Sequence, residues 1–372
     1  MASVSLKNVY KYYWSKKGKV EAVKNLNLDI RDKEIMVLLG PSGCGKTSTL
    51  RMIAGIEEIS KGKLYIGDNL SNNLTPAQRN IALAFEDYAL YFHLTVKENI
   101  ALCLEAKKID SNIIKKRIKD ISEILGIGDV LDLKTTALSG GQQQRVSLAR
   151  ALVRDPSIFL LDEPISHIEI EKRYRILAEI KEINHKFGST MLYVTHNQTE
   201  AIAVGKRIGV MNFAELQQVG TRDEIFNNPI NLFVAGFVGQ PPINIMKCKI
   251  ISEKDVIILK VENSSLEFIP EAKIAKELYK LNFKEVILGL RPQNIYIRKV
   301  SDKQKSIKGI IEVKEFLGED MHLVLKSGDL KFSVYCNIDM GLKKDKELEL
   351  FYDQNRLHLF HPETEKVISA SL

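Results

Sequence analysis

Cysteine and tryptophan are scarce in this chain, and long hydrophobic runs are missing. The 372 residues include 4 Cys and 1 Trp. The cysteines are far apart and form no C-x-x-C pair, which argues against a zinc site or a disulfide framework and favours a reducing compartment. No stretch approaches the roughly 18 uninterrupted apolar residues of a spanning helix, and residues 1–6 lack the pattern of a secretory signal. We therefore expect a soluble protein that works at a membrane only through a partner.

The composition is otherwise that of an ordinary globular protein. Hydrophobic residues make up 45% and charged residues 27%, which excludes wholesale disorder, and the length favours two or three domains. The net charge of +7 is a mild basic bias that suits an anionic ligand or membrane surface. Because the lysines are spread along helices, we expect solvated faces and no nucleic-acid partner.

The first part of the chain has the pattern of an α/β fold. Short apolar runs alternate with helical periodicity, which predicts a mainly parallel sheet covered by helices. The expected strands are residues 35–39, 158–162, 191–196 and 208–211, and the expected helices are residues 48–54, 112–125 and a segment after residue 142. Before them, alternation around Val4 to Val9 and around Leu26 to Ile30 predicts two more strands, with residues 12–19 as a polar turn between them.

The pattern changes after about residue 237. Residues 239–242, Gly-Gln-Pro-Pro, are typical of a linker. Beyond them, short strands separated by turns predict a small antiparallel barrel, and a duplicated pair of small barrels remains an alternative.

Residues 40–47 match the phosphate-binding loop in both pattern and context. Gly40, Gly45, Lys46 and Thr47 lie between a buried strand and a helix. Glycines allow successive backbone N–H groups to face phosphate oxygens, and the helix presents its positive end to the same anion. Lys46 is expected to reach the outer phosphates, and the Thr47 hydroxyl to bind Mg²⁺.

Two carboxylates follow the apolar strand at residues 158–161. Asp162 and Glu163 lie at the carboxyl end of this strand, where α/β sheets bind ligands. We expect Asp162 to contact Mg²⁺, and Glu163 to act as the general base for the water that attacks the γ-phosphate. The sequence therefore predicts a site that binds a nucleotide and Mg²⁺ and hydrolyses the γ-phosphate.

A third motif gives the chain a family resemblance. Residues 138–145, Leu-Ser-Gly-Gly-Gln-Gln-Gln-Arg, lie between the phosphate loop and the Leu-Leu-Asp-Glu-Pro segment, and Val-Thr-His follows at residues 194–196. In this order and spacing, the motifs resemble those of ABC-transporter ATPase subunits over residues 1–236. Residues 289–293, Gly-Leu-Arg-Pro-Gln, resemble a tail element of the maltose-type, carbohydrate-importer branch, with Gln293 where Glu is usual.

The resemblance implies a domain plan. Residues 1–236 would form a P-loop ABC ATPase domain with a helical subdomain at about 87–153. Residues 237–245 would be a linker. Residues 246–372 would form a β-rich regulatory domain with an OB-like (TOBE/MOP-type) barrel.

The resemblance also implies roles for single residues. Lys46, Glu163 and His196 would be catalytic, with His196 as the switch histidine, and Thr47, Glu86 and Asp162 would hold Mg²⁺. ATP would contact Tyr13, Gly40, Pro41, Ser42, Gly43, Cys44, Gly45, Lys46, Thr47, Ser48, Glu86, Ser139, Gly140, Gly141 and Gln142. Tyr13 would stack on adenine, and Tyr12 or Trp14 are alternatives for that role.

The implied assembly contains other chains. A second ABC ATPase subunit, the same chain or a different one, would complete each ATP site by placing its residues 139–142 on the γ-phosphate. Two transmembrane permease subunits would be driven by closure and opening of the ATPase dimer, and one would meet residues 88–96 through a coupling helix. An extracytoplasmic solute-binding protein would take part indirectly. The expected location is peripheral, at the cytoplasmic face of the cell membrane, and the expected cargo is a sugar or a related small polar solute.

Four positions depart from the family pattern. Glu86 stands where Gln is usual, Glu169 where Asp ends the D-loop, Phe92 where Pro is usual, and Asn197 where Asp follows the switch histidine. An ionised Glu86 can bind Mg²⁺ but cannot donate a hydrogen bond as Gln can. These changes favour one half of an ATPase heterodimer with unequal sites; a homodimer with slower turnover is the other explanation.

Three alternatives come from other classes. A non-transport ABC ATPase would carry a coiled-coil insertion or two cassettes, neither of which is visible. An exporter half would lack the β-rich tail. A regulatory module that binds nucleotide with little turnover is disfavoured by the presence of Glu163 and His196.

Overall fold

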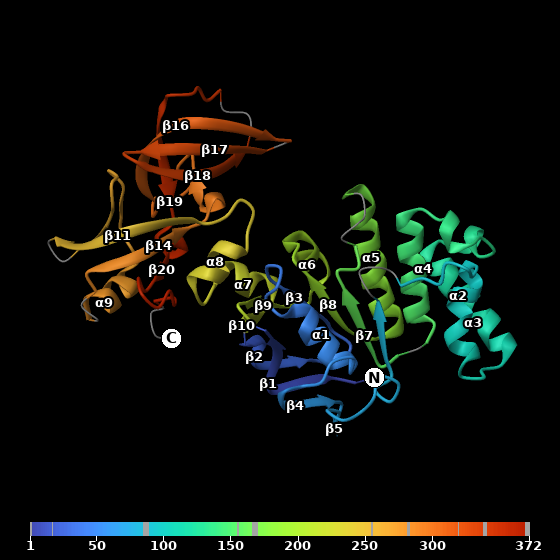
Figure 1. The fold of residues 1–372 in the computed structure, drawn as a ribbon. Coiled ribbons are helices and arrows are strands. Elements are labelled where there is room, and N and C mark those ends of the chain that lie inside the picture. The colour runs from blue at the N-terminus through green and yellow to red at the C-terminus, as the bar shows by residue number, and fades with distance from the viewer. Residues whose placement is uncertain are drawn as a thin grey trace. The chain divides into compact units, whose positions relative to one another are not determined.

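The computed structural model describes residues 2–16, 18–84, 89–154, 156–165, 170–253, 256–280, 283–318, 320–337 and 341–368. It divides into two compact units, Met1–Asp223 and Glu224–Leu372, whose elements are labelled in Figure 1.

A six-stranded sheet forms the centre of the first unit. Its strand order is β10 (Glu215–Gly220), β9 (Arg207–Asn212), β3 (Ile35–Leu39), β8 (Thr190–Thr195), β7 (Ile158–Asp162) and β6 (Ile81–Ala84). All neighbours are parallel except β10, which runs antiparallel to β9. Every residue of β3, β7 and β8 is buried, as expected for parallel strands covered on both faces. The predicted α/β fold with a mainly parallel sheet is confirmed.

Helices on this sheet have apolar faces that reach its core. Leu50 and Ile53 of α1 (Lys46–Ala54) belong to the same buried cluster as Leu38 and Leu160. α6 (Gln198–Val204) contacts β3 and β8, and α5 (Ile170–Phe187) contacts α6. α1 itself contacts β7 and β8 and follows β3 through residues 40–45, so its start lies near the carboxyl end of β3.

A second sheet, antiparallel, lies beside α1 in the lower part of Figure 1. Its strand order is β2 (Gly18–Ile30), β1 (Val4–Ser15), β4 (Lys61–Ile66) and β5 (Asn69–Leu70). The prediction of a turn over residues 12–19 is wrong, because β1 and β2 remain paired up to Ser15 and Gly18, with Tyr12 opposite Glu21 and Trp14 opposite Lys19. Aromatic residues favour strands, and Lys19 Nζ lies 3.5 Å from the Tyr12 ring centre, which stabilises the pairing across the strands.

The remaining helices of the first unit pack on one another. They are α2 (Val96–Glu105), α3 (Ser111–Leu125) and α4 (Gly140–Leu152), together with the short turns η1 (Gly128–Val130) and η2 (Thr135–Ala137). The helix predicted over residues 112–125 is confirmed: Ile114, Ile118 and Ile121 of α3 are buried. In Figure 1 this helical group lies at one side of the unit.

The second unit is built mainly of two antiparallel sheets. One has the order β13 (Glu267–Phe268), β12 (Val256–Val261), β11 (Asn244–Glu253), β14 (Glu285–Leu290) and β20 (His358–Phe360). The other has the order β15 (Ile295–Tyr296), β19 (Glu347–Tyr352), β16 (Lys305–Leu317), β17 (Asp320–Ser327) and β18 (Leu330–Asn337). Both contribute to one buried cluster, so the expected β-rich, OB-like tail is confirmed.

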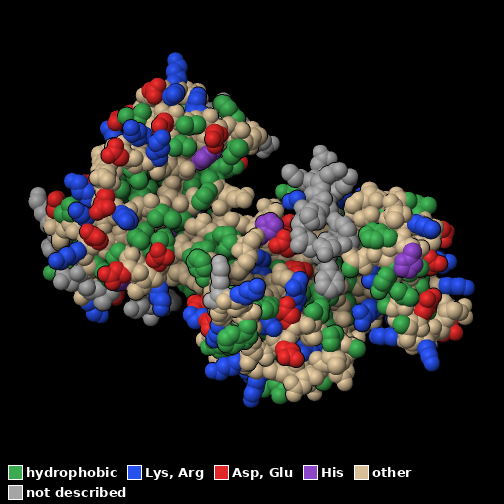
Figure 2. Space-filling view, in the orientation of Figure 1, with side chains coloured by type: hydrophobic (Ala, Val, Ile, Leu, Met, Phe, Trp, Pro, Cys, Tyr) green, Lys and Arg blue, Asp and Glu red, His purple; other side chains and the backbone are tan. Residues whose placement is uncertain are grey.

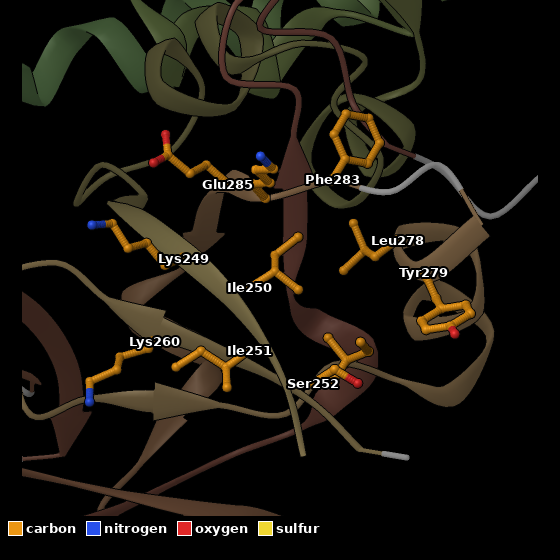
Figure 3. A pocket seen from close by; sticks show the side chains of 11 residues that line it. Lys249, Ile250, Ile251, Ser252, Lys260, Leu278, Tyr279, Phe283 and Glu285 are labelled. Atoms are coloured by element: carbon orange, nitrogen blue, oxygen red, sulfur yellow. The ribbon is translucent and has the colours of Figure 1, made fainter. Parts of the chain in front are cut away.

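One helix of this unit, α9 (Ala272–Lys280), has no counterpart in the sequence prediction. Leu278 of α9 is buried in the shared cluster. Figure 3 shows Leu278 and Phe283 on one side of an open groove of about 800 Å³, with Ile250 and Ile251 of β11 on the other. α9 therefore packs on this apolar cluster and contacts β12.

Arg291, in the tail motif at residues 289–293, has a packing role in this unit. It is 1% exposed, and its guanidinium donates to the carbonyls of Phe226 (2.9 and 2.6 Å) and Val238 (2.7 Å). These carbonyls lie near the C-terminal ends of α7 (Arg222–Asn227) and α8 (Leu232–Phe237), where a cation satisfies unpaired acceptors. Arg291 thus joins both helices to the end of β14.

Candidate functional site

The loop between β3 and α1 has the backbone geometry of a phosphate cradle. Gly43 and Gly45 have φ values of 78° and 104°, which other residues adopt only with strain. A Cβ atom at Gly45 would also lie 2.3 Å from the Ala22 carbonyl oxygen. Glycine is therefore required where the loop turns into α1, and the first N–H groups of that helix point out of it without intrahelical acceptors.

Lys46 lies folded against this loop. It is 4% exposed, and its ammonium donates to the carbonyls of Gly40 (2.9 Å) and Pro41 (3.0 Å). Cys44 is buried beside it, and burial raises the pKa of the Cys44 thiol, so this side chain remains a neutral packing group.

A hydroxyl and a carboxylate meet next to the loop. Thr47 Oγ1 donates to Asp162 Oδ1 at 3.1 Å, which joins the start of α1 to the end of β7. Hydroxyl and carboxylate oxygens are the hard ligands that Mg²⁺ prefers, so this pair fits the predicted metal site. Glu86, the third predicted ligand, lies outside the described residues.

The two residues expected to act on water are in direct contact. His196 Nδ1 lies 2.9 Å from Glu163 Oε2, with the Glu163 side chain 18% exposed and that of His196 53% exposed. Glu163 follows β7 with a φ of 45°, and its backbone N–H donates to Val194 of the neighbouring strand β8. A partly solvated carboxylate and an imidazole therefore stand side by side at the edge where β7 and β8 end.

The turn that carries His196 is held by hydrogen bonds that the sequence prediction did not include. Glu200 is buried and accepts from the hydroxyls of Tyr193 (2.9 Å) and Thr195 (2.8 Å). Asn197 accepts from the backbone N–H groups of Thr199 and Glu200 and so caps α6. The spacing of Asn197 and Glu200 is a helix-start signal that could have revealed this support.

Tyr13 is the aromatic residue at the end of β1 that approaches the phosphate loop. Its hydroxyl lies 3.3 Å from Ser48 Oγ of α1 and donates to Glu57. Burial and the hydrogen bond to Glu57 raise the pKa of the Tyr13 phenol, so it stays protonated. Its contact with Ser48 in the first turn of α1 favours Tyr13 over Tyr12 and Trp14 for contact with a bound base.

The predicted family motif at residues 138–142, Leu-Ser-Gly-Gly-Gln, lies at the start of α4. Ser139 is the N-cap, and a capping box joins its side chain to the backbone of Gln142 and the Gln142 side chain to the backbone of Ser139. Apart from the helix's own backbone, a Cβ atom at Gly140 or Gly141 would meet no heavy atom within 4 Å. In Figure 1, α4 lies on the other side of α5 and β7 from α1, so this segment is not brought to the loop of its own chain.

Some predicted positions cannot be placed. Residues 85–88, including Glu86, and residues 166–169, including Glu169, lie outside the described residues. In the part of the chain that is described, no group of three or more His, Cys, Asp or Glu side chains is arranged to hold a metal ion.

The surface and the helices add two observations. On the face shown in Figure 2, Lys and Arg side chains are interspersed with Asp and Glu and form no single basic patch. Within the described ranges, each helix is too short or too polar to cross a membrane.

Comparison with known proteins gives consistent matches. Residues 23–166 match the ABC transporter family. The chain is 39% identical to the trehalose/maltose import ATP-binding protein MalK of Thermococcus litoralis, an alignment covering 99% of this chain and 100% of that protein. It is 41% identical to the oligosaccharides import ATP-binding protein MsmX of Bacillus subtilis over 98% of this chain and 99% of that protein. A solved dimeric structure of a post-hydrolysis state of the ATP-binding cassette MJ0796, bound to ADP and Pi, matches with a TM-score of 0.55 and 32% identity over 59% of this chain and 98% of that one.

Proposed function

The chain belongs to the ABC transporter family as an ATP-binding ATPase subunit, and from this premise we propose that it powers the import of a sugar or a related small polar solute. The two import proteins described above are similar over nearly the whole chain, including the β-rich second unit. The observation that carries the catalytic part is the meeting of two pairs, Thr47 with Asp162 and Glu163 with His196, beside one phosphate loop.

The phosphates of ATP would occupy the cradle formed by residues 40–45. Lys46 would exchange its two carbonyl acceptors for phosphate oxygens, because an ammonium prefers an anionic acceptor. Thr47 and Asp162, with Glu86, would hold Mg²⁺, which when bound neutralises charge on the phosphates.

Hydrolysis would proceed by proton transfer to Glu163. Its carboxylate would accept a proton from the water that attacks the γ-phosphate, and the products are ADP and inorganic phosphate. His196, oriented by Glu163 and by the turn that Glu200 supports, would donate to the γ-phosphate. These groups bind, orient and move one proton, which is what phosphoryl transfer requires of a protein.

A second ATPase subunit would complete the site. Ser139, Gly140 and Gly141 form an open helix start that can bind a γ-phosphate held by another chain. Removal of that phosphate would let the pair open, and the permease subunits would convert opening and closure into transport. A solute-binding protein outside the membrane would deliver the cargo to the permease.

An exposed aromatic surface is our candidate for the permease contact. Tyr91 and Phe92 are exposed, and the Arg150 guanidinium lies 4.8 Å from the Tyr91 ring centre. Beside them is a cavity of about 90 Å³ whose lining includes Cys103, Arg150 and Arg154. A permease helix that docks here would hold the chain at the cytoplasmic face of the membrane as a peripheral subunit.

The test of catalysis is Glu163→Gln in the full chain. We expect phosphate release to fall by about 100-fold or more, in line with the loss of a general base, while ATP binding is retained. Glu182→Gln, the same change at an exposed position of α5, is the matched control and should be unaffected. A regulatory module without turnover is the second candidate, and it would be favoured if the unaltered chain, assembled with its permease, released no phosphate.

We also propose that the two ATP sites of the assembled transporter are unequal. The support is Glu86, which adds a negative charge and removes a donor where the family has Gln. Glu86→Gln in the assembled transporter is expected to raise ATPase activity. Activity that stays the same or falls would contradict the proposal, and a single ATPase chain in the purified complex would favour the homodimer.

A further inference from the structure

The side chain of Tyr13 is held by charged groups that the proposed mechanism does not use. We propose that Glu57, with Lys11, is a positioning residue for the adenine base, because it fixes the Tyr13 ring on which the base stacks. This inference rests on the proposed function, in which Tyr13 provides that stacking surface.

Glu57 is the centre of the network. Its carboxylate accepts the hydroxyl of Tyr13 and lies 3.5 Å from both Lys11 Nζ and Arg51 Nη1. The Glu57 side chain is 17% exposed, so these contacts are partly shielded from water. Because Lys11 and Arg51 both form ion pairs with the Glu57 carboxylate, they restrict its position while it accepts the hydrogen bond from the Tyr13 phenol.

Lys11 fixes the ring from a second direction. It is 9% exposed, and its ammonium donates to the main-chain carbonyl of Glu58 at 2.9 Å. The same ammonium lies 4.9 Å from the Tyr13 ring centre, within the range of a cation–π contact. Lys11 therefore occupies one face of the ring, while Tyr13 as a whole is 37% exposed and so accessible to a planar ligand.

The Tyr13 ring lies close to the phosphate loop, where the base of a bound nucleotide could reach it. Its hydroxyl is next to Ser48 of α1, immediately after Lys46 and Thr47. A base that stacks on Tyr13 would belong to a nucleotide whose phosphates occupy the loop. A side chain already held in one rotamer loses less conformational entropy on binding than a freely rotating one, so the network should increase affinity for the base and not for the phosphates.

The experiment compares ATP with inorganic tripolyphosphate, which has the phosphates but no base. Dissociation constants are measured for the full chain in EDTA, which prevents hydrolysis. We expect Glu57→Ala to weaken ATP binding about five- to tenfold, a part of the stacking contribution, and to leave tripolyphosphate binding unchanged. Glu57→Gln, which keeps an oxygen acceptor for the phenol, should stay within about twofold of the unaltered chain.

The matched control is Glu58→Ala. It removes the same charge one residue away, but the Glu58 side chain is exposed and only its main-chain carbonyl takes part in the network. We expect no change in the binding of either ligand. An equal effect of Glu57→Ala on ATP and tripolyphosphate would overturn the inference, because it would mean that the loop itself was disturbed.

Variants of Tyr13 separate this inference from the proposed function. Tyr13→Phe keeps the ring but loses the bond to Glu57, so its effect and that of Glu57→Ala should not add in the double variant. It also serves as the test should Glu57→Ala fail to fold. If Tyr13→Ala weakens ATP binding but Glu57→Ala and Tyr13→Phe do not, the inference fails and the stacking role stands. If Tyr13→Ala has no effect either, the stacking role and the inference fail together.

Discussion

Lys46 illustrates how a single charged residue is prepared for a ligand. An ammonium has three donors. Two of them are directed at the carbonyls of Gly40 and Pro41, and the third contact is Cys44 Sγ at 3.9 Å, a weak acceptor. A phosphate oxygen is a stronger acceptor than this sulfur, so a bound phosphate would give the third donor of Lys46 a stronger hydrogen bond.

His358 gives a prediction at the residue scale. Burial, reinforced by the positive charges of Arg291 and Arg356, lowers the pKa of His358 to about 4, against about 6.5 in an unfolded chain. Between these pH values the unfolded state binds a proton that the folded state does not. The free energy of unfolding therefore keeps the full contribution of His358 above pH 6.5 and loses it as the pH falls towards 4, by at most about 3 kcal/mol.

Urea unfolding at a series of pH values, followed at the transition of the second unit, measures how the free energy of unfolding depends on pH. The His358→Gln variant should lose less stability between pH 7 and pH 4.5 than the unaltered chain. Identical pH slopes for the two proteins would show that the pKa of His358 is not lowered in the folded chain.

Single residues differ in how far the sequence reveals them. Lys46, Thr47 and Asp162 could be predicted because their chemistry depends on a short motif or on the end of an apolar strand. Glu57 could not, because its partner Tyr13 is separated from it by two strands and a helix, and only the tertiary fold brings them together. Glu200 is intermediate, since its helix-start spacing is visible but its contact with Tyr193 is not.

At the scale of elements, we expect one substitution at the start of α4 to have different effects on stability and on ATPase activity. Gly141 lies in the first turn of this helix, and an added Cβ would meet only the helix's own backbone within 4 Å. Alanine is favoured over glycine in helices by up to about 1 kcal/mol. We therefore expect Gly141→Ala to leave the thermal stability unchanged or slightly raised.

The same substitution should remove most ATPase activity, because the methyl group would occupy the space where the partner's γ-phosphate must approach. Gly128→Ala, in the turn η1, also adds a Cβ into open space and is the control that should keep its activity. Full ATPase activity in Gly141→Ala would mean that this helix start does not face a nucleotide. Thermal melts and phosphate release measured on the same preparations provide both readouts.

The elements also show where local pattern is insufficient. The strands and helices of the first unit have clear apolar periodicity, so most could be placed from the sequence, whereas the connection of β1 and β2 was misread because Tyr12 to Trp14 stand among polar residues. α9 was missed because it is short and lysine-rich, and its apolar residues, such as Ile274 and Leu278, make sense only against the sheet that they cover.

At the scale of the whole molecule, the proposed function divides one ATP site between two chains. The loop, Thr47 with Asp162, and Glu163 with His196 are assembled in one unit. Ser139, Gly140 and Gly141 belong to the same unit, and the proposed function directs them to the nucleotide of another chain. Sequence motifs predict this division between two chains, and the departures at Glu86 and Glu169 favour a different chain as the second subunit.

The central claim is that ATP is hydrolysed only between two ATPase subunits. The most direct test measures molar mass by light scattering and phosphate release on the same samples of full chain, with ATP, over a range of protein concentrations. We predict that monomeric samples release no phosphate and that turnover appears only where two ATPase subunits are associated. A strictly monomeric sample that hydrolyses ATP at a rate per chain independent of concentration, and equally fast with Gly141→Ala, would contradict the account.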